Sequence, residues 1–217
     1  MPAGNDALGQ VQAFRIRVSK LNANGVPSNG ANKTYVSNSV VVLNTTPVYT
    51  DGVDIQDRNG EGIVCVSFQG PDTFRRIDWD LTICTPDANL LEMLTGGKVL
   101  TSGGQTGFAY PVMGTSDPTN ISIELWTKRV NDGSLDDTYP YARWVLGRCK
   151  NMRMGKKVFG NQSVQPMVSG KAYDNPNWFD GPLNDWRVAS DRVLQWMPVL
   201  TSDVPAASLT YGTVAAS

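Results

Sequence analysis

Histidine is absent from the 217-residue sequence, and its absence removes whole classes of catalytic and metal-binding site. Without an imidazole there can be no Ser-His-Asp or Cys-His arrangement and no histidine-ligated metal. Zinc held by thiolates alone would need close pairs of cysteines, and Cys65, Cys84 and Cys149 stand far apart. The sequence therefore predicts no catalytic residue, no metal site and no cofactor, and we expect the protein not to be an enzyme.

Membrane-spanning and secretory segments are also missing. No apolar run approaches the roughly 18 residues of a membrane helix, and the N-terminal sequence MPAGND lacks the basic cluster and apolar core of a signal peptide. An odd number of cysteines without a signal is typical of reduced thiols in a cytoplasm. We therefore expect synthesis in a cytoplasm and no membrane contact. Two of the cysteines lie in apolar strand patterns, which favours small buried hydrophobic residues.

Charge of either sign is scarce, because charged residues make up 18% of the chain and the net charge is −1. A dedicated nucleic-acid-binding protein carries a basic excess that neutralises phosphates, so this balance argues against that function. Charged helix-forming residues are too few for a helical protein, whereas 21 glycines and 13 prolines are typical of a chain rich in turns. The composition therefore predicts a mainly β fold.

Alternation of apolar and polar residues gives the clearest local signal of strands. In residues 74–84 the apolar side chains alternate with Asp78 and Asp80. Residues 121–130 alternate in the same way, with Glu124 on the polar face. We expect a half-buried strand at each place, with the three carboxylates exposed.

Three roles are open to these carboxylates. Most carboxylates on the polar face of a strand simply meet solvent. A pair of them could instead act as acid and base in glycoside hydrolysis. In a tubular assembly, Asp78, Asp80 and Glu124 could line an acidic channel that repels DNA phosphates, and we take them as candidate lumen-facing residues.

One segment, at about residues 86–95, has a complete set of helix signals. Thr85 can cap its first turn, Pro86 suits the first helical position, and Asp87 complements the positive end of the helix dipole. The glycines at 96–97 end the helix, and a second glycine pair at 103–104 predicts a flexible loop. A helix this short is stable only when packed, so we expect it to flank a sheet through Leu90, Leu91 and Leu94.

The ends of the chain differ in composition from its middle. Residues 1–10 are small and polar, and proline recurs after Asn175 with few periodic apolar positions. We expect one β-rich domain over residues 11–174, with an N-terminal arm (1–10) and a C-terminal arm (175–217) that become ordered on partners. Asn-Gly pairs predict an extended loop at about residues 22–33, because Asn-Gly favours tight turns.

Residues 143–157 carry six arginines or lysines and no acid. A solvated strand and turn would account for this composition. The same residues could instead contact an acidic neighbouring subunit, or form a nucleic-acid patch, although the aromatic residues of a base-stacking platform are few here. Of the two functional alternatives, we favour the subunit contact.

Residues 175–186 contain Trp178 and Trp186 among prolines, asparagines and aspartates, a composition that cannot form a regular element. The tryptophans could stack on a sugar, as in a carbohydrate-binding module. They could also anchor the segment on its own domain or on a neighbouring subunit, since interfaces favour aromatic residues. We favour anchoring and take both as candidate inter-subunit anchors.

Three passages together resemble the major tail-tube proteins of siphophages that infect actinobacteria. They are LTICTPDANLLEMLTGG (81–97), YPYARW (139–144) and GKAYDNPNWFDGPLNDW (170–186). In layout the similarity extends over about residues 12–187, and these passages are its most specific part.

The resemblance implies a β-sandwich or β-barrel-like domain with one flanking helix and with loop and terminal arms. It also implies hexameric rings stacked into a tube, a lumen through which genomic DNA passes without specific binding, and contacts with other tail proteins at the tube ends. The family has no catalytic residues to carry over. The expected location is the virion, after synthesis in the host cytoplasm. A different virion role (tail tip, head–tail connector or capsid decoration) and a carbohydrate-binding β-sandwich are the alternatives.

Overall fold

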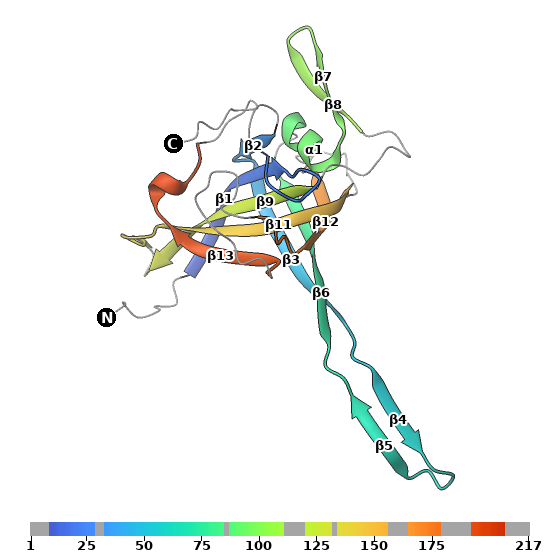
Figure 1. Ribbon diagram of the computed structural model, residues 1–217. Helices are drawn as coiled ribbons and strands as arrows, with labels where there is room; N and C mark the ends of the chain where they lie inside the picture. The colour runs from blue at the N-terminus through green and yellow to red at the C-terminus, as the bar shows by residue number, and fades with distance from the viewer. Residues whose placement is uncertain are drawn as a thin grey trace.

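The computed structural model describes residues 9–28, 33–84, 87–110, 120–131, 134–155, 165–178 and 192–206. The fold is mainly β, as predicted, with one short α-helix (Figure 1). The main sheet contains β1 (Gly9–Lys20), β2 (Thr34–Ser37), β3 (Val40–Thr50), β6 (Thr73–Ile83), β9 (Ile121–Asn131), β10 (Ser134–Leu135), β11 (Tyr141–Met154), β12 (Met167–Tyr173) and β13 (Leu194–Val199). Two separate hairpins consist of β4 (Asp54–Arg58) with β5 (Val64–Gln69), and of β7 (Lys98–Ser102) with β8 (Gln105–Ala109).

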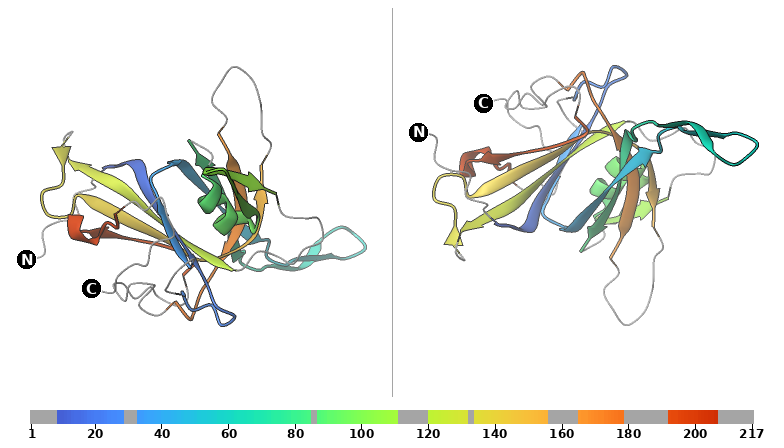
Figure 2. Two further views of the ribbon diagram at one scale, coloured as in Figure 1. Left: turned by 90° about the horizontal axis from the view of Figure 1, so that it is seen from above. Right: turned by 90° about the horizontal axis from the view of Figure 1, so that it is seen from below.

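The main sheet is antiparallel and follows the order β2-β1-β9-β11-β12-β6-β3, with β10 beside β9 and β13 beside β11. Residues 38–39 connect β2 directly to β3, so the first and last strands of this path are neighbours in sequence. The sheet therefore curls round a core, as Figure 2 shows from above and below. β3 is an edge strand and contains Pro47, which is tolerated at an edge although proline cannot donate a ladder hydrogen bond.

The core is filled from the inner faces of the strands and from the helix. In β6 the side chains Ile77, Trp79, Leu81 and Ile83 are buried, whereas Asp78 and Asp80 point to the other face, so the predicted alternation is confirmed. Their core partners include Ile16, Val18, Ile121, Ile123 and Val168. The three cysteines lie at different depths: Cys149 is buried, Cys84 half-buried and Cys65 exposed.

Helix α1 (Ala88–Thr95) begins slightly later than predicted. Its N-cap is Asp87, whose carboxylate accepts a hydrogen bond from the backbone N–H of Leu90 at 3.1 Å, while Thr85 lies outside the described residues. Asp87 also accepts hydrogen bonds from the hydroxyls of Tyr35 and Ser37 on β2, which fasten the helix to the sheet. Gly96 ends the helix in the left-handed region at φ 70°, as expected.

The apolar face of α1 gives a direct test of its packing. Leu94 is completely buried among the core residues. Changing Leu94→Asp would remove that packing and bury an unpaired carboxylate, so we expect a loss of about 4 kcal/mol or more in the free energy of unfolding. Thermal unfolding followed by circular dichroism measures the change. Glu92→Asp, on the less buried side of the helix, is the control, and a Leu94→Asp protein that melts like the wild type would show that this face is not part of the core.

The C-terminal region is only partly the arm that its composition suggests. Strand β13 pairs with β11 over six residues, from Tyr141 opposite Val199 to Leu146 opposite Leu194. This ladder makes it an integral strand of the sheet, and Val199 at its end is buried, which proline content does not reveal. The expectation of an arm is therefore wrong for residues 194–199, and residues 1–8, 179–191 and 207–217 lie outside the described part of the chain.

Candidate functional site

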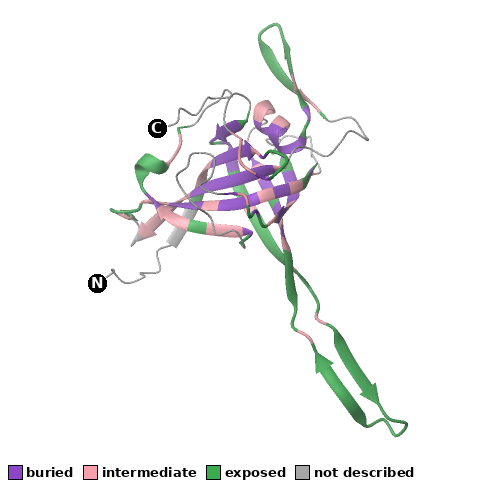
Figure 3. Ribbon diagram, viewed as in Figure 1, coloured by how far each residue is buried: buried purple, intermediate pink, exposed green. Residues whose placement is uncertain are grey.

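A long β-hairpin projects from the body of the molecule (Figure 1). It comprises residues 48–76, formed by the outer ends of β3 and β6 and by the hairpin β4–β5, and we refer to it as the arm. No residue of the arm is buried, and Figure 3 shows it exposed over most of its length. At about 3.4 Å per residue, its strands extend roughly 35 Å from the body.

Local sequence determines where the arm turns and where its strands cross. At the tip, the Asn59 side chain accepts hydrogen bonds from the backbone N–H groups of Glu61 and Ile63, at 3.0 and 2.9 Å. Halfway along, Gly52 and Gly70 bring the two chains so close that a side chain on Gly52 would overlap the carbonyl of Gly70. The glycine is needed there for its size, since the backbones could not otherwise approach each other.

The arm is amphipathic. Ile55 lies opposite Phe68 and Asp57 opposite Val66, and residues directly opposite each other in an antiparallel pair share a face. The same face therefore carries Ile55, Val66 and Phe68, which are 44%, 51% and 56% exposed, together with Asp57. The other face is polar, with Asp54 opposite Gln69 and Gln56 opposite Ser67.

Nothing within the described chain covers this apolar face. A two-stranded hairpin standing alone is at best marginally stable in water. Burying a large aliphatic or aromatic side chain contributes about 1.5–3 kcal/mol, so three exposed ones leave a substantial driving force unused. A contiguous apolar patch of this kind is typical of a surface that binds another protein.

The arm also differs from the body in charge. Its outer part, residues 51–72, contains five acidic residues and only one basic residue, Arg58, and therefore has a net charge of −4. Because the chain as a whole has a net charge of −1, the remaining residues together have a net charge of +3. The acids of the arm are Asp51, Asp54, Asp57, Glu61 and Asp72.

A second hairpin, β7–β8, projects at the opposite end of the molecule (Figure 1). The predicted flexible loop at 103–104 is in fact its two-residue turn, in which Gly103 and Gly104 have φ of 57° and 80°. Its outer part is small and polar, with Leu100 as its exposed large apolar residue. It therefore lacks the apolar face of the arm.

The structure does not bring the three predicted carboxylates together. Asp78 and Asp80 do point away from the core on β6, as expected. Asp78 is paired with Arg76 at 2.6 Å, and its hydrogen bond to that guanidinium holds the pKa of Asp78 below its usual value. Strands β11 and β12 separate β6 from β9, where Glu124 lies.

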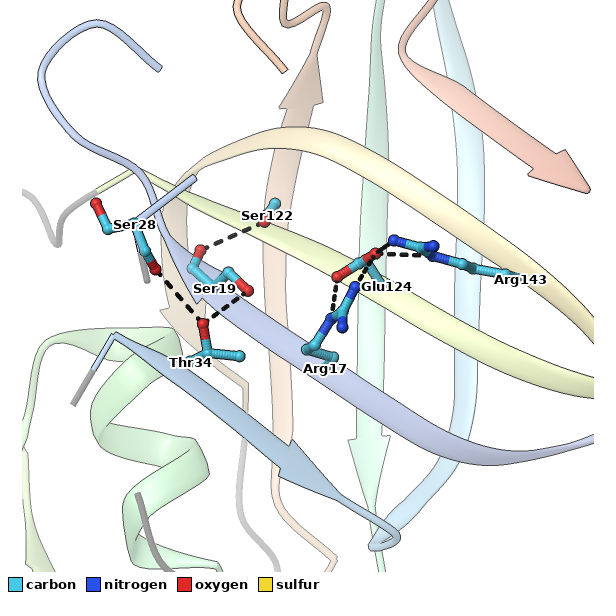
Figure 4. Close-up of polar contacts among 7 residues, drawn as sticks. All are labelled: Arg17, Ser19, Ser28, Thr34, Ser122, Glu124 and Arg143. Atoms are coloured by element: carbon cyan, nitrogen blue, oxygen red, sulfur yellow. Dashed lines mark hydrogen bonds and ion pairs between the residues drawn. The ribbon is translucent and has the colours of Figure 1, made fainter. Parts of the chain in front are cut away.

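Glu124 is completely buried, so its prediction as a lumen-facing residue is wrong. Figure 4 shows its carboxylate between Arg17 and Arg143, with bonds of 2.8 Å from Arg17 Nη2 and 2.9 Å from Arg143 Nε. Both guanidinium groups lie over the ring of Trp126, at 5.3 and 5.6 Å from its centre. Burial raises the pKa of Glu124, but Arg143 and Arg17 outweigh it and hold the pKa below its ordinary value.

This second buried face explains why the alternation in β9 was misread. Polar and apolar positions of β9 are both buried from Ile121 to Trp126, because chain packs on both sides of the sheet. The polar side chains bond to one another here: the Thr34 hydroxyl donates to Ser19 Oγ at 3.3 Å, and Ser122 donates to the Ser19 carbonyl at 3.4 Å (Figure 4). A pattern of period two cannot distinguish solvent from a second packed layer.

Trp178 is one of the residues that cover this face. It is buried in its own chain against Val145, so its prediction as an inter-subunit anchor is wrong and anchoring on its own domain is correct. Trp186 lies outside the described residues. Nearby, Asn175 donates hydrogen bonds to the carbonyls of Gly25 and Gly147, at 2.8 and 2.9 Å, and so ties the predicted Asn-Gly loop to the body.

Comparison with known proteins does not help to assign a function to these features. The chain matches no model of a known protein family and no curated protein. In the described part of the chain, no cluster of three potential metal-ligating side chains occurs, and no helix is long and apolar enough to span a membrane. The arm is therefore the feature from which function has to be argued.

Proposed function

We propose that the protein is a self-assembling structural subunit whose arm binds a neighbouring copy, and that the assembly is the tail tube of a siphophage. The observation that carries this proposal is the amphipathic arm, which exposes one continuous apolar face on a hairpin with no core of its own. A monomer gains nothing from such a surface, whereas a subunit gains contact area from it.

The position of the arm favours an open or ring-forming assembly. It projects from one side of the body, which leaves the other surfaces of a neighbouring copy free to receive it (Figure 1). Such heterologous contacts generate rings when the rotation closes and filaments when it does not. A tube of stacked rings needs contacts of both kinds. The hexameric ring and the DNA-conducting lumen are what the resemblance to tail-tube proteins implies, through residues 81–97, 139–144 and 170–186.

Other virion roles would use the same arm, and only the shape of the assembly separates them from a tube. The carbohydrate-binding alternative is weaker, because Trp178, one of its two proposed stacking residues, is buried. The assignment of Asp78 and Asp80 to the lumen remains a prediction. The charges around them do not favour an acidic wall, since Arg76 is bonded to Asp78 and Lys171 lies opposite it on β12.

The experiment that tests this function places charge on the apolar face of the arm. We expect the double substitution Val66→Asp and Phe68→Asp to leave the body folded and to raise the concentration needed for assembly by about a hundredfold or more, because each lost contact is worth about 1.5–3 kcal/mol. Sedimentation velocity measures assembly, and negative-stain electron microscopy shows whether the particles are tubes, rings or neither.

The matched control is Leu100→Asp on the hairpin β7–β8, where a similarly exposed leucine is 49% accessible but belongs to no apolar face. This variant is expected to assemble like the wild type. Wild-type protein that stays monomeric at high concentration, or an arm variant that assembles normally, would contradict the proposed function.

A further inference from the structure

A cluster of basic side chains lies on the outer face of β11 and β12. Lys150 and Lys171 are direct cross-strand partners, and Arg153 lies further along β11 opposite Ser169. On the next strand, Arg76 belongs to the same side of the sheet. Arg76 belongs to the base of the arm, so we refer to the other three residues, Lys150, Arg153 and Lys171, as the basic face.

The basic face contains an unfavourable pairing. Like charges directly opposite each other on neighbouring strands are destabilising, and Lys150 faces Lys171 in this way. Asp78 lies opposite Lys171 on its other side, but that carboxylate is already bonded to Arg76. An anion supplied from outside would therefore relieve a repulsion that the described chain leaves in place.

The same face is hollowed. A cavity of about 320 Å³ opens there, and its wall contains Arg153 and Lys171 together with Asp78, Asp80 and Asn151. The hollow lies where β11 bulges: Asn151 has a φ of 54°, and the register between β11 and β12 shifts next to it. A hollow of this size has room for a protruding side chain of a partner.

The arm of a second copy matches this surface in charge and shape. Its outer part, residues 51–72, is acidic, with a net charge of −4 against +3 for the rest of the chain, and Glu61 lies at its narrow tip. The arm of the same molecule points away from its body, so it does not lie on its own basic face (Figure 1). Opposite charges on different surfaces of one chain are what a head-to-tail contact requires.

Nucleic acid fits the basic face less well. Asp78 and Asp80 stand among the bases and would repel phosphates, and the chain as a whole has no basic excess. Asp78 and Asp80 reduce the positive charge of the face to a modest value, which suits a protein arm that contains both acidic and apolar residues.

We propose that the acidic arm of one copy docks on the basic face of the next, with the acids of the arm set against Lys150, Arg153 and Lys171. This inference rests on the proposed function, because it names the surface that receives the arm. It also gives a role to Lys150 and Arg153 of the basic segment 143–157, whose composition the apolar face of the arm does not explain.

Charge reversal on both surfaces tests the docking. One variant reverses the arm (Asp54→Lys, Asp57→Lys, Glu61→Lys), a second reverses the face (Lys150→Glu, Arg153→Glu, Lys171→Glu), and a third carries all six changes. Each single-surface variant is expected to need about tenfold more protein to assemble, whereas the six-fold variant should assemble at nearly the wild-type concentration. Circular dichroism and melting establish that each variant is folded, and wild-type assembly should weaken as salt rises.

Several results would overturn the docking. A folded face-reversed variant that assembles like the wild type would do so, as would a six-fold variant no better than either parent. Tight binding of a short fluorescent DNA duplex, lost on reversing the face but unchanged on reversing the arm, would assign the face to nucleic acid. If the wild type formed no assembly at all, the proposed function would fail and this inference with it.

Discussion

Changing Glu124→Gln is expected to lower the free energy of unfolding by about 3–5 kcal/mol, a large part of the stability of an ordinary domain. The substitution keeps the shape of the side chain but removes the negative charge between Arg17 and Arg143, whose side chains are buried. Removing one partner of a buried ion pair leaves the other charge without compensation in a medium of low dielectric constant. Denaturant unfolding followed by tryptophan fluorescence measures the loss.

The control is Glu61→Gln at the exposed tip of the arm, which should leave stability unchanged. Acid provides a second readout. Because the folded protein holds the pKa of Glu124 below its ordinary value of 4.5, the stability that the ionised carboxylate contributes is complete above pH 4.5 and is lost as the pH falls through the folded value. The Gln variant should lack this part of the acid sensitivity. Equal stability of both proteins across this range would show that the charge cluster contributes nothing to the fold.

Deleting residues 188–217 is expected to unfold the body or make it insoluble. The deletion removes β13, so six residues of β11 lose their ladder partners and the ring stack between Trp144 and Trp196 is lost. It also removes the buried Val193 and Val199, which contribute about 1.5–3 kcal/mol each. Soluble yield and the melting temperature measure the effect.

A shorter deletion, of residues 207–217, keeps every residue of β13 and serves as the control. It should fold with an unchanged melting temperature. If the longer deletion also left a stable body, β13 would be dispensable for folding, and the C-terminal segment would be free to act as the assembly arm that its composition suggests.

Several parts of the fold followed from the sequence because they depend on neighbouring residues. The alternation around Asp78 and Asp80 specifies a strand with one buried face, and side-chain period alone fixes which residues share that face. The helix could be placed almost to the residue, since Asp87 and the glycine at 96 satisfy backbone groups that only helix ends leave free. Only the identity of the N-cap differed.

The errors all concern what covers a surface. Glu124 and Trp178 were expected to face outward, but a layer of the same chain packs over both of them. The C-terminal segment was expected to become ordered on partners, but β13 pairs with β11 of the same chain. Local sequence specifies which side chains share a face, and it contains no information about which distant segment lies against that face.

The arm shows the same limit of sequence analysis, but here a strand face that would be expected to be buried is exposed. Strand β5 is rich in valine and phenylalanine, and nothing in its sequence indicates that it leaves the body and finds no partner there. An apolar strand face is normally assumed to meet a core, because burial is its usual source of stability. Sequence thus determined the strands, the helix and the charges of this protein. Only the tertiary structure decided which faces are buried and that the apolar face of the arm is exposed, because burial depends on contacts between segments far apart in the chain.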